Sequence, residues 1–388
     1  MIYLDNAATT APSPDILRKT FDFAGEVYGN PNSLHAAGIA VGKAVESART
    51  EVMNSVANGV PGYFVFTSSG TEANNLALFG AAEARGRRGG RIIITDSEHD
   101  SVYRSIKKLE EKGFDAVYLS TKGGAIDTNE LKNALDDRTI IVSVMSVNNE
   151  TGAIYDTASV SKILAETYSD AKTRPLFHTD AVQAFGKIPL APADLVSISA
   201  HKIHGLKGTG GLFIREGTRI LPILFGGHDE KGLRASTPNT PGIYAIGLAA
   251  KAAADNLAAD NAKVSELWDY TKVRISELCP KAQFTSDCFT NPKAVSKYIL
   301  SLRLPGTRSE VVLNHLSANG ICISSGSACS AKSTSANESK RVLYAFGLTK
   351  EEADSTLRIS FCANNTKEEA DELAQTLSEA HTRFSVSL

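Results

Sequence analysis

Short apolar runs alternate with longer helical patterns along the chain from Pro61 onward. The runs cover residues 63–67, 91–95, 116–119, 139–147, 176–180, 195–199 and 211–214. Most are apolar throughout rather than alternating, as expected of strands that are buried on both faces. Helical patterns, such as those over residues 101–112 and 157–169, lie between them. The pattern therefore predicts a wound α/β domain around a mostly parallel, seven-stranded sheet.

A different pattern follows in the C-terminal part of the chain. Residues 243–258 predict a long helix that leaves the sheet domain, and a second helix is expected over residues 263–279. Apolar runs at 298–302 and 357–360 and a final amphipathic helix predict a smaller α+β domain. We therefore expect a large domain over residues 15–258 and a small domain formed by residues 1–14 and 259–388.

Composition and charge exclude several classes of function. The formal net charge of -2 gives no electrostatic reason to expect binding to nucleic acid or to an anionic membrane. No apolar run approaches the length of a membrane span, and the N-terminus has no signal-like stretch. The five cysteines form no CxxC pair, which favours a reducing, cytoplasmic compartment.

Polar segments follow the apolar runs at the points where the predicted strands end. They are SSGTEANN after the first run, DSEHDS after the second, NNETG after the fourth, DAVQ after the fifth and AHK after the sixth. Ligands of open α/β sheets bind beyond the carboxyl ends of the strands. We therefore expect these five loops to meet in one pocket.

Two of these loops carry residues that suit an aldehyde cofactor. Lys202 follows a buried run, and a desolvated lysine readily forms Schiff bases, although a plain loop lysine is the alternative. Asp180 either caps a following helix or faces the ring nitrogen of pyridoxal phosphate, which needs a carboxylate there. Their places at adjacent strand ends favour a pyridoxal phosphate site. His201 and His204 have no third ligand nearby, so we expect no metal.

The other loops indicate an anion site and a lone histidine. Gly70 and Thr71 lie where a strand becomes a helix, and the N–H groups and dipole at a helix start favour a phosphate. Capping of this helix by Thr71, with Glu72 in its first turn, is an alternative compatible with phosphate binding. His99 is either structural or suited to ring stacking or proton transfer.

A cysteine in the segment ISSGSACSA raises a separate question. Free cysteines usually pack among apolar side chains, whereas Cys329 is surrounded by serine, glycine and alanine. The thiol is either incidental on a loop or placed there to react.

Taken together, these stretches resemble the pyridoxal-phosphate-dependent cysteine desulfurases of the NifS and IscS type, within the class V aminotransferase family. The resemblance rests on YLDNAATT, GNPNSLH, FTSSGTEANN, the EH of residues 98 and 99, VNNETG, FHTDAVQAFGKI, SAHKIHGLKG, SSGSACS and LRIS. It implies the type I fold of pyridoxal phosphate enzymes and a homodimer with shared active sites. The implied reaction converts L-cysteine to L-alanine and leaves a persulfide on Cys329, for an acceptor protein in iron-sulfur cluster assembly or tRNA thiolation.

The resemblance also implies roles for the matching residues. Lys202 would hold the cofactor as a Schiff base, His99 would stack on its ring, and Cys329 would accept the sulfur. Arg358, with Asn149, would bind the substrate carboxylate through a two-pronged hydrogen bond. The residues implied in cofactor binding are Gly70, Thr71, Asn149, Asp180, Gln183, Ser199, His201, Lys202 and, toward the other subunit, Thr237.

One segment departs from the family pattern. In GGHDEKGLRASTPN, the residues at His228, Asp229, Ser236 and Pro238 differ from those common in the family, and Thr237 is retained. Added bulk at His228 and Ser236 is expected to reshape the mouth of the pocket. Two other functions stay open: a selenocysteine lyase or another class V pyridoxal phosphate enzyme, and a non-catalytic docking scaffold.

Overall fold

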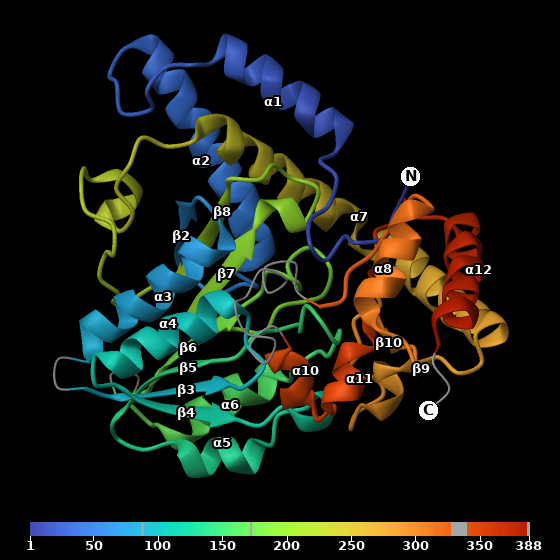
Figure 1. The fold of residues 1–388 in the computed structure, drawn as a ribbon. Helices are drawn as coiled ribbons and strands as arrows, with labels where there is room; N and C mark the ends of the chain where they lie inside the picture. Colours follow the sequence, from blue (N-terminus) through green and yellow to red (C-terminus); the bar gives the residue numbers. More distant parts are fainter. Residues whose placement is uncertain (87–88, 171–172, 327–339, 386–388) are drawn as a thin grey trace.

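A seven-stranded sheet forms the centre of the protein, with strand order β2-β8-β7-β6-β5-β3-β4 (Figure 1). The computed structural model describes residues 1–86, 89–170, 173–326 and 340–385. β8 runs antiparallel to both neighbours, and the other pairs are parallel. This confirms the predicted α/β fold. The strands are β2 (Gly62–Thr67), β3 (Arg91–Thr95), β4 (Asp115–Leu119), β5 (Thr139–Ser143), β6 (Leu176–Asp180), β7 (Leu195–Ser199) and β8 (Gly210–Arg215).

Helices cover both faces of this sheet. Because successive side chains of a strand point to opposite faces, Ile93 of β3 joins one apolar cluster with α2, α6 and α7, whereas Ile92 and Ile94 join another with α3 and α4. This explains why the strands are apolar throughout. The helices of this region are α1 (Pro14–Glu26), α2 (Ala36–Val56), α3 (Gly70–Arg85), α4 (Asp100–Glu111), α5 (Thr128–Ala134), α6 (Thr157–Thr167) and α7 (Thr240–Leu278).

Two elements differ from the sequence prediction. The apolar run over residues 139–147 is a strand only to Ser143, and residues 144–147 stay buried outside the strand. The apolar character of Val144, Met145 and Val147 therefore reflects their burial, although they lie beyond the strand. The two helices expected at 243–258 and 263–279 are one helix, α7. Residues 258–263 are partly or fully exposed and contain neither glycine nor proline, so the apolar pattern lapses while the helix continues.

A second, smaller group of elements lies beside the sheet (Figure 1). Here β10 pairs with β12 and β9, and β1 pairs with β11 in parallel. Their apolar cluster includes Leu4, Val264, Leu300 and Leu373, which supports the small domain; its bounds remain a prediction. The elements are β1 (Ile2–Tyr3), β9 (Gln283–Phe284), β10 (Ile299–Arg303), α8 (Ser309–Ala318), β11 (Ile321–Cys322), α10 (Arg341–Phe346), α11 (Lys350–Asp354), β12 (Thr356–Ser360) and α12 (Lys367–Phe384).

The helices in the described ranges include none with both the length and the apolar character needed to cross a bilayer.

Candidate active site

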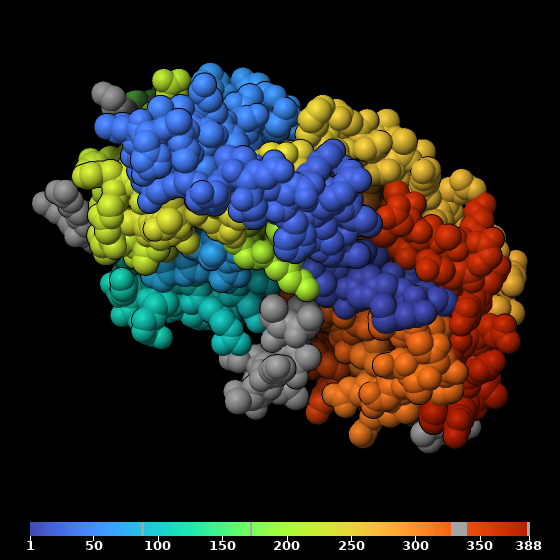
Figure 2. Space-filling view, turned by 90° about the horizontal axis from the view of Figure 1, so that it is seen from above, coloured from blue at the N-terminus to red at the C-terminus, as the bar shows by residue number. Residues whose placement is uncertain are grey.

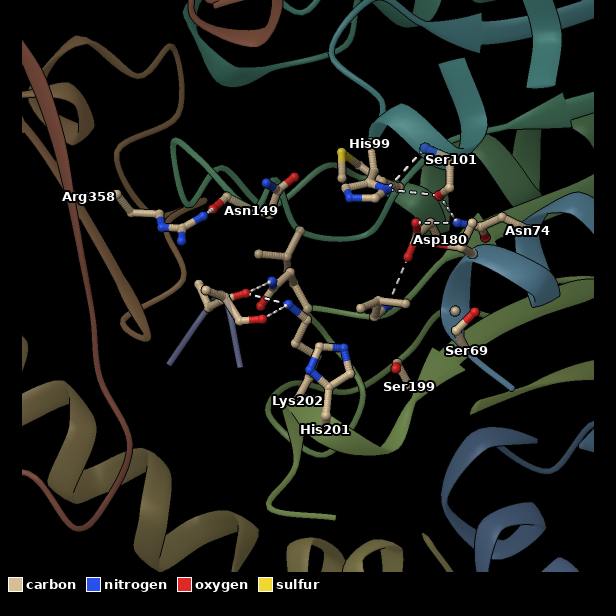
Figure 3. Close-up of a pocket in the computed structure, with 18 residues that line it drawn as sticks. Ser69, Asn74, His99, Ser101, Asn149, Asp180, Ser199, His201, Lys202 and Arg358 are labelled. Carbon is tan, nitrogen blue, oxygen red and sulfur yellow. Dashed lines mark hydrogen bonds between the residues drawn. The ribbon is translucent and has the colours of Figure 1, made fainter. Parts of the chain in front are cut away.

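A cavity of about 160 Å³ lies where the loops after β2, β3, β5, β6 and β7 meet (Figure 3). The convergence expected from the strand ends is therefore present. Thr237 is exposed and does not line this cavity, and Cys329 lies outside the described residues. The other predicted site residues all line it: Gly70, Thr71, His99, Asn149, Asp180, Gln183, Ser199, His201, Lys202 and Arg358.

Lys202 ends a short 3-10 helix, Ala200–Lys202, that directly follows β7. Its Nζ donates hydrogen bonds to the backbone oxygens of Ala7 and Ala8, at 2.5 and 2.7 Å. The N-terminal segment thus holds the lysine amine inside the cavity. Ala7 O also accepts a hydrogen bond from Gln183 Nε2 at 2.8 Å, so that one carbonyl orients two of the predicted residues.

Asp180 is the last residue of β6 and is only 4% exposed. Its Oδ2 accepts a hydrogen bond from Asn74 Nδ2 at 2.7 Å, and its Oδ1 accepts one from the backbone N–H of Val182 at 2.9 Å. The second bond closes a turn. Residues 182–187 form turns, so the helix that Asp180 was expected to cap as an alternative is not present. These two hydrogen bonds therefore fix the orientation of the Asp180 carboxyl group in the cavity.

His99 begins α4 as its N-cap residue. Its Nδ1 accepts from the backbone N–H of Ser101 at 3.1 Å, which assigns the ring proton of the neutral imidazole to Nε2. Burial lowers the pKa of His99, and the nearby carboxylate of Asp180 opposes this shift. The neutral ring is thus favoured, which suits stacking on an aromatic cofactor.

The start of α3, with Ser69, Gly70 and Thr71, also lines the cavity. Ser69, rather than Thr71, caps this helix, because Ser69 Oγ accepts from the N–H of Glu72 at 3.1 Å. The first N–H groups of a helix have no partner within it and attract anions. A Cβ at Gly70 would lie 2.7 Å from Val182 Cγ2 and 3.5 Å from Ser199 Cβ, so only glycine fits here.

Two side chains near this helix start have properties that suit a phosphate. Ser199 Oγ is buried and has no hydrogen-bond partner in the described part of the chain. His201 Nδ1 lies 3.1 Å from Thr9 Oγ1. Burial, assisted by the charge of Lys202, lowers the pKa of His201 to about 4, so its ring is neutral. An unsatisfied hydroxyl beside a helix N-terminus fits a phosphate group.

Arg358, in β12, reaches the cavity from the smaller group of elements (Figure 3). Its Nη1 donates to the backbone oxygen of Asn149 at 2.9 Å, and its Nη2 donates to Asp5 Oδ1 at 2.8 Å. Arg358 Nε and Asn149 Oδ1 are buried and have no partner within the described ranges. The two residues thus offer a donor and an acceptor to a ligand.

The motifs and the site geometry agree with the comparisons to known proteins. Residues 2–373 match the family model described as aminotransferase class V. A cysteine desulfurase of Trichormus azollae is 36% identical over 375 residues, which cover 93% of this chain and 88% of that protein. The chain belongs to the class V aminotransferases, among their cysteine desulfurases.

Other members of this family support the assignment. The cysteine desulfurase IscS of Clostridium botulinum strain Hall is 36% identical over 367 residues, covering 92% of this chain and 89% of that protein. A solved NifS-like protein is 33% identical, with a TM-score of 0.87 over 97% of this chain and 98% of its own. The resemblance drawn from the sequence motifs, including the type I fold, is therefore confirmed.

Several residues of this desulfurase site were not predicted individually from the sequence. Ala7 and Ala8 act through backbone oxygens, which leave no chemical signal in a sequence. Asn74 and Ser101 also line the cavity, and Asn74 Nδ2 donates to Ser101 Oγ at 2.8 Å as well as to Asp180. The available signals were the family motif YLDNAATT for Ala7 and Ala8 and, for Asn74 and Ser101, the segments SSGTEANN and DSEHDS, which were expected to meet in one pocket.

The segment that departs from the family pattern lies away from this cavity. His228, Asp229 and Pro238 line a separate cavity, together with Arg49 and Glu230. Within this chain His228 lines that cavity rather than the candidate site, and the expected effect of His228 and Ser236 on the mouth of the pocket stays a prediction. Arg234 connects the segment to the site more directly, because its Nε lies 2.8 Å from Glu72 Oε1 in the first turn of α3.

Proposed function

We propose that this enzyme converts L-cysteine to L-alanine and leaves the sulfur as a persulfide on Cys329, with pyridoxal phosphate as its cofactor. One observation carries the proposal: Asp180 ends β6, Lys202 lies just past the neighbouring strand β7, and both line one cavity. A lysine amine and a carboxylate for the ring nitrogen are the two groups that pyridoxal phosphate requires of a protein.

The residues of the cavity suit this cofactor along its whole length. Ser199, with the first turn of α3, would hold the phosphate, and Asp180 would hold the proton of the ring nitrogen. His99 would cover the ring face, and Gln183 with Asn149 would reach the ring hydroxyl. When bound, pyridoxal phosphate supplies an aldehyde that condenses with amines and a ring that withdraws electrons from the substrate Cα.

The chain's own residues would then bind the substrate and cleave its Cβ–S bond. Arg358 and Asn149 would hold the carboxylate of L-cysteine, and Lys202 Nζ would take up the Cα proton. A bond forms between Cys329 Sγ and the substrate sulfur as the Cβ–S bond breaks. The three-carbon remainder takes up protons and leaves as L-alanine, so one thiol and one cysteine become one persulfide and one alanine.

The test follows alanine and persulfide after addition of L-cysteine to the purified protein. Cys329→Ser should keep the cofactor's visible absorbance and abolish persulfide formation, and Lys202→Ala should abolish turnover. Cys288→Ser is the matched control, because Cys288 is an exposed free thiol elsewhere in the chain. Sulfur release that survives in Cys329→Ser would refute the acceptor role. A parallel assay with L-selenocysteine distinguishes a selenocysteine lyase.

The enzyme is further proposed to act as a homodimer, in which Thr237 reaches the cofactor phosphate of the other subunit. Large apolar side chains are exposed in two segments: Tyr28 is 81% exposed, Leu34 94% and Phe225 82%. Figure 2 shows the blue N-terminal part of the chain beside the yellow-green part near residue 225. Asn32 Nδ2 donates to Asp229 Oδ1 at 2.6 Å, so the two segments that carry these residues touch. Exposed apolar patches of this kind mark interfaces.

Sedimentation measures this association directly. The double variant Leu34→Glu and Phe225→Glu should sediment as a monomer, whereas Val273→Glu, at an exposed position on α7, should remain dimeric. A monomeric parent protein would contradict the proposal.

The persulfide would pass to a second partner, a cytoplasmic sulfur-acceptor protein of iron-sulfur cluster assembly or tRNA thiolation.

A further inference from the structure

Asp5 joins two residues that come from distant parts of the chain. Its Oδ1 accepts a hydrogen bond from Arg358 Nη2 at 2.8 Å, and its Oδ2 accepts one from Ser324 Oγ at 2.9 Å. The Arg358 side chain is 2% exposed and that of Asp5 is 16% exposed. This ion pair is therefore largely shielded from water. Shielded charges attract each other more strongly than charges at a surface do.

The guanidinium of Arg358 is held from two sides. Asp5 accepts from Nη2, and the backbone oxygen of Asn149 accepts from Nη1 at 2.9 Å. With both terminal nitrogens fixed, the planar group has a single orientation. Its Nε has no partner in the described part of the chain, and the side chain lines the cavity. Donors thus remain for a ligand.

Asp5 is itself fixed independently of this ion pair. The neighbouring Leu4 donates its N–H to Cys322 O at 2.9 Å, and Leu4 O accepts from the N–H of Ser360 at 2.7 Å. The Leu4 side chain is 1% exposed, within the apolar cluster of the smaller region. The backbone at position 5 therefore forms a rigid support, which stays in place when the carboxylate is removed.

We propose that Asp5 is a positioning residue, which fixes the Arg358 guanidinium in the orientation that binds the carboxylate of the amino acid substrate. Asp5 does not line the cavity and acts only through Arg358. The inference rests on the proposed role of Arg358 as the carboxylate ligand. The inference gives a role to Asp5, the acidic residue of YLDNAATT, which has no part in the proposed reaction.

The experiment compares two ligands that differ only in a carboxylate. L-alanine and ethylamine are titrated into the holoenzyme, and binding is followed by calorimetry and by the cofactor's visible absorbance. Asp5→Asn keeps the shape of the side chain and removes its charge. We expect the affinity for L-alanine to fall by about tenfold or more, as for the loss of a charge-assisted hydrogen bond, and that for ethylamine to stay within about twofold.

Two control variants separate the explanations. Ser324→Ala removes the other hydrogen bond of Asp5 and leaves the ion pair, so it should bind L-alanine within about twofold of the parent. The proposal is overturned if Asp5→Asn binds L-alanine normally, if it loses ethylamine equally, or if Ser324→Ala shows the same loss. Arg358→Lys with unchanged L-alanine binding would instead remove the role of Arg358. L-alanine binding needs no sulfur chemistry, so the result does not depend on desulfurase activity.

Discussion

Glu230 connects the segment that departs from the family pattern to the edge of the central sheet. Its Oε2 accepts from Arg49 Nη1 and from the backbone N–H of Phe66, each at 2.8 Å, and its Oε1 accepts from Arg49 Nη2 at 3.0 Å. The Glu230 side chain is 7% exposed. Phe66 lies in β2, the strand at the edge of the sheet. One carboxylate therefore neutralises a half-buried arginine and completes the pairing of an edge strand.

The substitution Glu230→Gln should destabilise the protein markedly. Removal of one partner from a buried ion pair costs about 3–5 kcal/mol, and the amide oxygen of glutamine still serves Phe66, so we expect about 3 kcal/mol. The unfolding entropy is about 2.1 cal/mol/K per residue, which for 388 residues turns this loss into a Tm decrease of about 4 °C.

Calorimetry of the purified variants tests this value. Glu46→Gln is the matched control, because Glu46 also pairs with Arg49, at 3.1 Å, but its side chain is 69% exposed. Exposed pairs contribute at most about 1 kcal/mol, so this control should shift Tm by about 1 °C or less. The reasoning fails if Glu230→Gln lowers Tm no more than Glu46→Gln does.

Two further substitutions test groups near the cavity. Burial lowers the pKa of Lys187 from its ordinary value of 10.5 to about 8. Burying the charged amine therefore lowers the free energy of unfolding. This destabilisation is absent above pH 10.5, grows as the pH falls, and is complete below pH 8. Lys187→Met removes this destabilisation but also the hydrogen bond to Gln183, so urea unfolding should show it about 2 kcal/mol more stable than the parent at pH 7. At pH 10.5 it should be no more stable than the parent. Equal stability of the two proteins at pH 7 would contradict this reasoning. Asn74→Ala removes a 2.7 Å hydrogen bond to the Asp180 carboxylate and should weaken cofactor retention in dialysis by about tenfold. Asn75→Ala, whose amide donates to Thr71 O, should retain the cofactor normally, and equal losses in both variants would refute the specific role.

The sheet and the position of the site were predictable because local pattern determines both. Strands buried on both faces are continuously apolar, and the polar residues that end them lie at one edge of the sheet. Lys202 and Asp180 were found in this way. Arg358 was found only through the family motif, because it comes from a strand of the smaller region and reaches the cavity across the chain.

The contacts that hold the site were beyond sequence reasoning. Lys202 and Ala7 are 195 residues apart, and their contact depends on a backbone oxygen that every residue carries. Glu230 and Lys231 have φ values of 47° and 59°, in the left-handed region that usually signals glycine or asparagine. A tertiary ion pair stabilises this turn, so no local signal was present. The continuity of α7 was missed because an exposed helical stretch has no apolar periodicity.

The N-terminal strand has a consequence for the order in which the enzyme matures. β1 pairs with β11, and Asp5 and Ala7 contact Ser360, more than 350 positions later. During synthesis on the ribosome, β1 and the Asp5 side chain therefore have no partner to pair with until nearly the whole chain has been translated. The residues that form the sheet emerge before Arg358, which completes the pocket. A bulky fusion placed before Met1 would act on this final step.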